Sequence, residues 1–122
     1  MSESEIQKEI MKYLKSLPDS KTLRLNSQGT IIRGRIMKSK DTLPDILFLY
    51  RALAYFFEIK TPTEKDFITK HYERLLEGSF SDSNKDLKRY KAQIEILNEI
   101  KATGNHASFV SSVEDVKLAL QD

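Results

Sequence analysis

The stretch LPDILFLYRALAYFFEIKTP, residues 43–62, constrains the fold more than any other part of the chain. Residues 44–50 and 53–60 are both rich in Ile, Leu, Phe or Tyr and lack a helical spacing of polar residues, which favours two β-strands. Arg51 and Ala52 lie between them, so the sequence predicts a hairpin centred on that pair. Three charged residues interrupt the apolar strands near one end of this hairpin: Asp45, Glu58 and Lys60.

The symmetry of the hairpin determines which residues face one another. A turn centred on Arg51 and Ala52 places Asp45 opposite Glu58, whereas a three-residue loop would shift the register and break this pairing. Opposed residues of an antiparallel pair have Cβ atoms roughly 4.5–5.5 Å apart and share a face, which Lys60, two residues after Glu58, also shares. We therefore expect the three charged side chains to converge.

Two carboxylates this close repel each other, so one takes a proton or a cation lies between them. Mg²⁺ and Mn²⁺ prefer oxygen ligands, and the backbone carbonyl of Ile59 could supply one in addition to Asp45 and Glu58. Lys60 could then hold an attacking water or hydroxide, or neutralise a phosphate oxygen. The pattern predicts metal-assisted phosphodiester hydrolysis. The alternative is that Asp45 caps a strand after Pro44 and that Glu58 and Lys60 are charges that protect a strand end.

A third acid lies on the first helix, which is expected over residues 3–17. Glu3 precedes Ile6 by three residues and Ile10 by seven, so it lies at the N-terminal tip of the apolar stripe. From there it could reach the site as a catalytic acid or a metal ligand. The alternative is that Glu3 only favours the helix dipole, and Glu5 is the other candidate for this acid.

The rest of the chain predicts one α/β (α+β) domain over residues 1–122. The expected elements are a strand, a turn and a second strand over 21–33, a loop over 34–42, helices over 64–77 and 86–103, a strand over 107–110 and a helix over 113–120. This order indicates a central mixed sheet flanked by helices. A chain of 122 residues can bury a single core.

The composition excludes several kinds of site. There is no cysteine, so thiolate metal sites and cysteine nucleophiles are excluded. The N-terminus MSESEIQKEI has no apolar segment typical of a secretory signal, and no apolar run approaches the ~20 residues of a membrane span. We expect a cytoplasmic protein with no membrane contact.

The formal net charge is only +2, but basic residues gather before Asp45. Clustered cations in loops beside a metal site suit contacts to DNA phosphates, which position DNA without reading its sequence. The alternative is a solvated basic face. The candidate DNA-binding residues are Arg24, Arg33, Arg35, Lys38 and Lys40.

Five ordered blocks, ESEIQKEIMKYL, RLNSQG, LPD, FFEIKTP and AQIEILNEIKATGNHASFVSSVEDVKLAL, resemble the VRR-NUC family of the PD-(D/E)xK nuclease superfamily. The resemblance implies a restriction-endonuclease-like αβββαβα core and Mg²⁺- or Mn²⁺-dependent DNA cleavage. It implies that Asp45 and Glu58 are metal ligands, Lys60 the catalytic lysine and Glu3 the helix-borne acid. It also implies that Gln93 lies near the active site; the alternative is that Gln93 only satisfies a backbone group.

The gap between Lys60 and Gln93 is longer than is usual in this family. Residues 63–86 therefore resemble an insertion with its own helix, which could form a dimer surface, grip DNA or cover the core. The family implies a homodimer that cleaves branched DNA such as four-way junctions. Two other functions stay open: a non-catalytic nucleic-acid-binding module on the same fold, and a dimeric assembly protein that uses the inserted helix as its interface.

Overall fold

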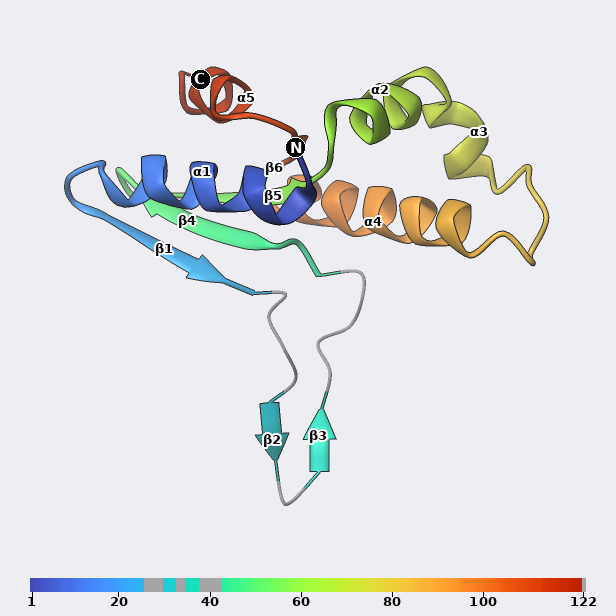
Figure 1. Cartoon of the computed structure of the whole chain (residues 1–122), viewed down its shortest axis with the longest axis horizontal. Helices are drawn as coiled ribbons and strands as arrows, with labels where there is room; N and C mark the ends of the chain where they lie inside the picture. Colours follow the sequence, from blue (N-terminus) through green and yellow to red (C-terminus); the bar gives the residue numbers. More distant parts are fainter. Residues whose placement is uncertain (26–29, 33–34, 38–42, 122) are drawn as a thin grey trace.

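The computed structural model describes residues 1–25, 30–32, 35–37 and 43–121 and has a mixed α/β architecture, in which helices flank a four-stranded mixed sheet (Figure 1). The described helices are α1 (Glu3–Lys15), α2 (Pro62–Lys70), α3 (Tyr72–Glu77), α4 (Lys85–Ala102) and α5 (Val113–Leu120). The described strands are β1 (Ser20–Arg24), β2 (Thr30–Ile32), β3 (Arg35–Met37), β4 (Ile46–Tyr50), β5 (Leu53–Ile59) and β6 (His106–Val110).

The main sheet has the strand order β1-β4-β5-β6. Strands β1, β4 and β5 are successively antiparallel, whereas β6 is parallel to β5. A parallel pair needs a long crossover, and α2, α3 and α4 supply it between β5 and β6. The strands β2 and β3 form a separate two-stranded sheet.

The predicted hairpin and its register are confirmed. Tyr50 pairs with Leu53 and Ile46 pairs with Phe57, so two residues form the turn. Arg51 and Ala52 have φ values of 52° and 63°. Positive φ at both central residues is the geometry of a type I′ turn, whose twist matches that of the flanking strands.

Helix α1 buries its apolar stripe on one face of the sheet. The side chain of Ser2 caps the helix by accepting a hydrogen bond from the backbone N–H of Glu5. Ile6, Ile10 and Leu14 are buried, as the helical spacing predicts. They form one core cluster with residues of β4, β5, β6 and α5, among them Ile46, Phe48, Tyr55, Phe57, Val110 and Val116.

Residues 62–77 fold as two helices, α2 and α3, rather than the single helix expected over residues 64–77. Thr61 and Glu64 form a capping box at the start of α2, and the helical geometry breaks at His71. Gly78, with a φ of 77°, ends α3 in the left-handed conformation. The two helices pack against α4 around a second buried cluster of Ile68, Leu75, Tyr90 and Ile94.

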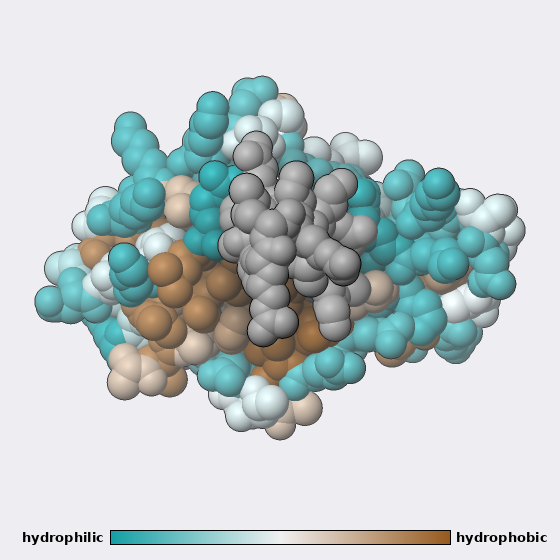
Figure 2. Space-filling model, turned by 90° about the horizontal axis from the view of Figure 1, so that it is seen from below, coloured by the Kyte–Doolittle hydropathy of each residue, from teal (hydrophilic) through white to brown (hydrophobic). Residues whose placement is uncertain are grey.

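The opposite face of the sheet is only partly covered. Because successive side chains of a strand alternate between faces, Leu47 and Leu49 point away from the core side of Ile46 and Phe48. Leu23, Leu47 and Phe56 lie side by side in the paired register of β1, β4 and β5, and Leu23 and Leu49 are 37% and 40% exposed. Figure 2 shows an apolar area on this side of the molecule.

The two strands expected over residues 21–33 are present as β1 and β2, which pair with β4 and β3 respectively. One prediction before residue 43 is wrong: Arg35–Met37 is a strand, although the sequence predicted a loop over 34–42. The turn expected at residues 26–29 lies outside the described residues. None of the helices in the described ranges has the length and apolar character that a membrane crossing requires.

Candidate metal and phosphodiester site

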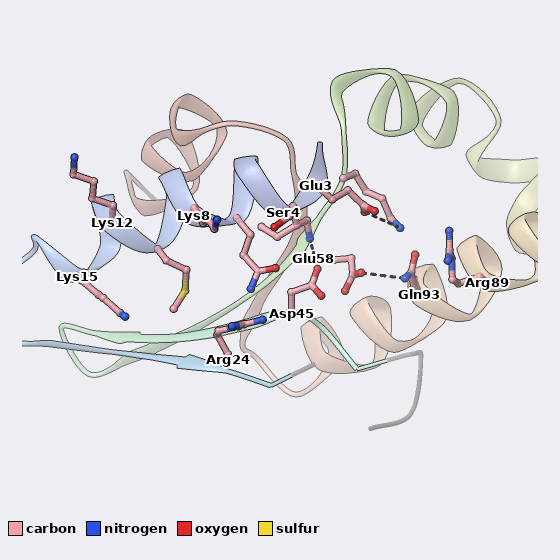
Figure 3. Close-up of a pocket in the computed structure, with 14 residues that line it drawn as sticks. Glu3, Ser4, Lys8, Lys12, Lys15, Arg24, Asp45, Glu58, Arg89 and Gln93 are labelled. Carbon is pink, nitrogen blue, oxygen red and sulfur yellow. Dashed lines mark hydrogen bonds and ion pairs between the residues drawn. The ribbon is translucent and has the colours of Figure 1, made fainter. Parts of the chain in front are cut away.

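A pocket of about 680 Å³ lies between α1, the ends of β4 and β5, and α4 (Figure 3). Asp45 directly precedes β4, Glu58 and Ile59 end β5, and Lys60 follows it, so the hairpin register places them together. The pocket brings together all the residues that the sequence predicted for catalysis and metal binding: Glu3, Asp45, Glu58, Ile59, Lys60 and Gln93.

Asp45 connects three strands at the rim of the pocket. Its Oδ2 accepts a hydrogen bond of 2.7 Å from the backbone N–H of Ile59, and its backbone carbonyl accepts one of 2.8 Å from Leu25. The carboxylate is half-buried and faces the pocket beside Glu58 (Figure 3). Asp45 therefore also has the structural role of a strand-end cap, and this role fixes its carboxylate in position.

Glu58 is a strongly perturbed titratable group of the site. Its side chain is 4% exposed, and its Oε1 accepts a hydrogen bond of 3.0 Å from Nε2 of Gln93. Burial, followed by the negative charge of Asp45, raises the pKa of Glu58 to about 9. Among the described residues, neither Oε2 of Glu58 nor Oε1 of Gln93 has a hydrogen-bond partner. Two buried oxygens are therefore available to a cation or to a proton shared with Asp45.

Lys60 lies deeper in the same pocket. It is 2% exposed, and its Nζ lies 3.9 Å from Oε1 of Glu3 and 5.0 Å from the ring centroid of Tyr90. Its backbone N–H donates to the carbonyl of Val110, so the position of the chain is fixed as well. A buried ammonium needs a nearby acid or ring face to offset its lost hydration.

Glu3, and not Glu5, is the acid that α1 brings to the pocket. Burial raises the pKa of Glu3, and the nearby Lys60 charge opposes this effect. Glu5 is exposed, hydrogen bonds with Ser2 and does not line the pocket. The alternative of a helix-dipole role does not account for the proximity of Glu3 to Lys60.

A polar connection behind Lys60 was not predicted from the sequence. The hydroxyl of Tyr90 donates to Oε2 of Glu64 at 3.1 Å, and Oε1 of Glu64 accepts from the backbone N–H of Thr61. Burial acts to raise the pKa of Glu64, but the hydrogen bonds of Thr61, the charge of Lys60 and the hydroxyl of Tyr90 together lower it. Glu64 and Tyr90 thus fix the ring on which Lys60 rests.

The basic residues of the pocket differ from the predicted set. Of the five candidates for DNA binding, Arg24 lines the pocket. Arg35 lies in β3, while the predictions for Arg33, Lys38 and Lys40 lie outside the described residues. Four basic residues that line the pocket were not predicted from the sequence: Lys8, Lys12, Lys15 and Arg89. The spacing of the three lysines by four and three residues was the signal that could have identified them.

The donor set suits a hard divalent cation. Mg²⁺ is held by one or two carboxylates and keeps several waters, and the adjacent oxygens of Asp45 and Glu58 match this requirement. The Oε2 of Glu58, which has no hydrogen-bond partner among the described residues, could serve as a ligand. Within residues 1–25 and 43–121, no three His, Cys, Asp or Glu side chains group closely enough to hold a metal. Backbone or water oxygens would therefore complete the coordination.

Comparisons with protein-family models, curated proteins and solved structures found no match.

Proposed function

We propose that the protein is a Mg²⁺- or Mn²⁺-dependent DNA endonuclease of the VRR-NUC type. The observation that carries this proposal is the meeting of Asp45, Glu58 and Lys60 in one pocket, where the buried Oε2 of Glu58 has no hydrogen-bond partner among the described residues. Side chains of this kind around a hard cation are suited to phosphodiester hydrolysis.

The order of the elements supports the same proposal. A helix, an antiparallel set of three strands, a helical crossover and a parallel fourth strand are what the restriction-endonuclease-like core requires. In this arrangement α2 and α3 are the insertion. Their apolar residues Ile68 and Leu75 are buried in one cluster with Tyr90 and Ile94 of α4, so the insertion extends the core of the domain.

Each of the predicted site residues has a role in the proposed reaction. Asp45, Glu58 and the backbone carbonyl of Ile59 would hold the cation, which supplies charge neutralisation at the phosphate and an acidified water. The ammonium of Lys60 orients the attacking water or neutralises a phosphate oxygen. Glu3 is the helix-borne acid that faces Lys60.

Gln93 keeps the Glu58 carboxylate in one rotamer through its hydrogen bond. In the reaction, a water oxygen forms a bond to phosphorus while the bond from phosphorus to the leaving oxygen breaks. The attacking water gives up a proton to solvent, and the leaving oxygen takes up a proton from solvent or from Lys60, which solvent then reprotonates.

We propose branched DNA, such as a four-way junction, as the substrate, and a homodimer as the active form. Resolution of such a junction requires a cut in each of two strands. A dimer would present one pocket to each of these strands. The apolar sheet face with Leu23 and Leu49 is the surface that best fits a second copy, because its leucine side chains are exposed. A cytoplasmic location remains part of this proposal.

Sedimentation or light scattering tests the dimer. We expect Leu49→Glu to convert a dimer to a monomer by placing a charge on the apolar sheet face. Leu118→Glu is the matched control, because Leu118 is 62% exposed on α5 and lies away from this face. A wild-type chain that is monomeric at all concentrations contradicts the dimer and leaves the nuclease proposal intact.

A second candidate function is a non-catalytic nucleic-acid-binding module on the same fold. The observation that favours it is that no three His, Cys, Asp or Glu side chains of the described residues group closely enough to hold a metal, and that Asp45 already caps a backbone N–H. In that case the pocket would bind phosphate through its basic residues alone.

Incubation of the purified protein with labelled four-way junction, flap and linear DNA, in Mg²⁺, Mn²⁺ or EDTA, separates the two functions. The nuclease proposal predicts metal-dependent cleavage that Asp45→Asn abolishes while DNA binding persists. Asp82→Asn, which changes an exposed acid outside the pocket, is the control and should cleave normally. Binding with no cleavage of any substrate in either metal contradicts the nuclease and supports the binding module.

A further inference from the structure

The pocket continues along α1 well beyond the acidic residues. Lys8, Lys12 and Lys15 line it together with Arg24 of β1, and all four side chains are exposed. Figure 3 shows the three lysines along α1, on the side of the pocket away from Gln93 and Arg89. The carboxylates thus lie toward one end of an elongated, otherwise basic groove.

The helical spacing explains why these lysines lie in one row. Residues separated by four and three positions share a face of an α-helix, so Lys8, Lys12 and Lys15 form a stripe that flanks the buried stripe of Ile6 and Ile10. Within the described part of the chain, the ammonium groups of these three lysines form no ion pair. The guanidinium of Arg24 forms none there either. Their charge is therefore available to an anion in the groove.

The dimensions match a nucleic-acid backbone. Helix α1 rises about 1.5 Å per residue, so Lys15 lies about 18 Å along the axis from Glu3. One strand of duplex DNA advances about 3.4 Å per nucleotide, which makes this distance equal to about five nucleotides. The three lysines are about 6 and 4.5 Å apart along the helix axis, which exceeds the advance of one nucleotide, so each can meet a different phosphate.

We propose that Lys8, Lys12, Lys15 and Arg24 form a DNA-backbone track that holds about five nucleotides on one side of the bond to be cut. This inference rests on the proposed nuclease function and adds an asymmetry to it: the enzyme grips the DNA on one side of the pocket along α1. The contacts are to phosphates, so the track positions DNA of any sequence.

Salt dependence of binding tests the track without any need for catalysis. The variant is Lys8→Gln/Lys12→Gln/Lys15→Gln, which keeps side-chain length and helix propensity. The matched control is Lys85→Gln/Lys88→Gln/Lys101→Gln, because these three lysines are also exposed and unpaired among the described residues but lie on α4 outside the pocket. Thermal melting confirms that both variants are folded.

Anisotropy of labelled duplex and junction DNA is measured in EDTA from 50 to 200 mM KCl. Each lost phosphate contact reduces the slope of log K against log[salt] by about 0.9, so the α1 variant should lose about two to three in slope and the control almost nothing. A wild-type slope in the α1 variant, or an equal loss in the control, overturns the track.

Substrate length provides the second readout. DNA shortened to fewer than about five base pairs on one side of the cut should lose cleavage by the wild type, and shortening on the other side should have less effect. The α1 variant should lose this asymmetry. If the wild type cleaves but shows no such asymmetry, the track is wrong and the nuclease stands; if the wild type neither binds nor cleaves DNA, both proposals fail.

Discussion

Gln93 donates a hydrogen bond of 3.0 Å to Glu58, and the free oxygen of each side chain has no partner among the described residues. A buried carboxyl that receives a single donor and lies beside another carboxylate is poorly stabilised in its charged form. Burial and the charge of Asp45 accordingly raise the pKa of Glu58 to about 9, so the metal-free protein holds Glu58 protonated at neutral pH.

The first prediction concerns stability and pH. In the unfolded chain Glu58 ionises near its ordinary pKa of 4.5, so between there and about 9 the folded state binds the extra proton. The free energy of unfolding of the metal-free protein should therefore fall as pH rises through this window, by at most about 1.4 kcal/mol per pH unit from this group. Urea unfolding at a series of pH values measures it.

Glu58→Gln should flatten this dependence, because glutamine cannot ionise. Exposed Glu77, which lies outside the pocket, supplies the control Glu77→Gln, which should leave the slope unchanged. An unchanged slope in Glu58→Gln would show that the Glu58 carboxyl is already ionised in the folded protein at neutral pH.

The second prediction concerns metal binding without DNA. A cation held by Asp45 and Glu58 must displace the proton of Glu58, so Mg²⁺ or Mn²⁺ should bind more tightly as pH rises toward about 9. Calorimetry in buffers of different ionisation enthalpy should find about one proton released per cation near neutral pH. At a hundredfold excess over Kd, the metal should stabilise the fold by about 2.7 kcal/mol.

Asp45→Asn should abolish this stabilisation while Asp82→Asn retains it. A cation that binds the wild type with no proton release would mean that Glu58 is not a metal ligand, whether or not the protein cleaves DNA.

The third prediction separates the ring of Tyr90 from its hydroxyl. Tyr90→Phe keeps the ring face that Lys60 contacts and loses only the hydrogen bond to Glu64. The kcat of the proposed DNA cleavage should therefore stay within about threefold of the wild-type value, and the free energy of unfolding should fall by about 1 kcal/mol. Tyr90→Leu removes the ring face. A cation–π contact of about 0.5–2 kcal/mol corresponds to a loss of about 2- to 30-fold in kcat.

Ile94→Val is the control for general loosening of the same core cluster, because Ile94 is 1% exposed there and does not contact Lys60 in any described interaction. It should cost about 0.5–1.5 kcal/mol of stability with kcat unchanged. Equal losses of kcat in Tyr90→Leu and Ile94→Val would contradict a positioning role for Tyr90.

The parts of the site that could be predicted are those set by local chain geometry. Asp45 and Glu58 belong to one hairpin, so a two-residue turn is enough to determine which residues meet. Glu3 was placed by the period of a single helix. In each case the deciding relation spans few residues and follows from a repeat of known period.

The parts that could not be predicted depend on which elements pack together. The contact between the Tyr90 ring and Lys60 requires α4 to pack against the end of β5. No residue spacing in the sequence indicates that contact. The pairing of β1 with β4 instead of β2 is of the same kind, because a short strand does not specify its partner. The break at His71 was not predicted, because the four-residue spacing of Phe67, His71 and Leu75 continues across it.

The last prediction concerns the turn that sets the register of the site. Ala52 adopts a φ of 63°, which costs a residue with a Cβ roughly 1–2 kcal/mol, and a type I′ turn favours glycine at this second position. Ala52→Gly removes that strain and loses about 0.4–1 kcal/mol through the greater freedom of the unfolded chain, so it should stabilise the protein by up to about 1 kcal/mol. Differential scanning calorimetry measures the shift in Tm. Ala54→Gly, in strand β5, should instead destabilise by about 0.5–1 kcal/mol, because glycine there gains no relief of strain. A fall in Tm for both variants would contradict the two-residue turn, and with it the register that brings Asp45 to Glu58.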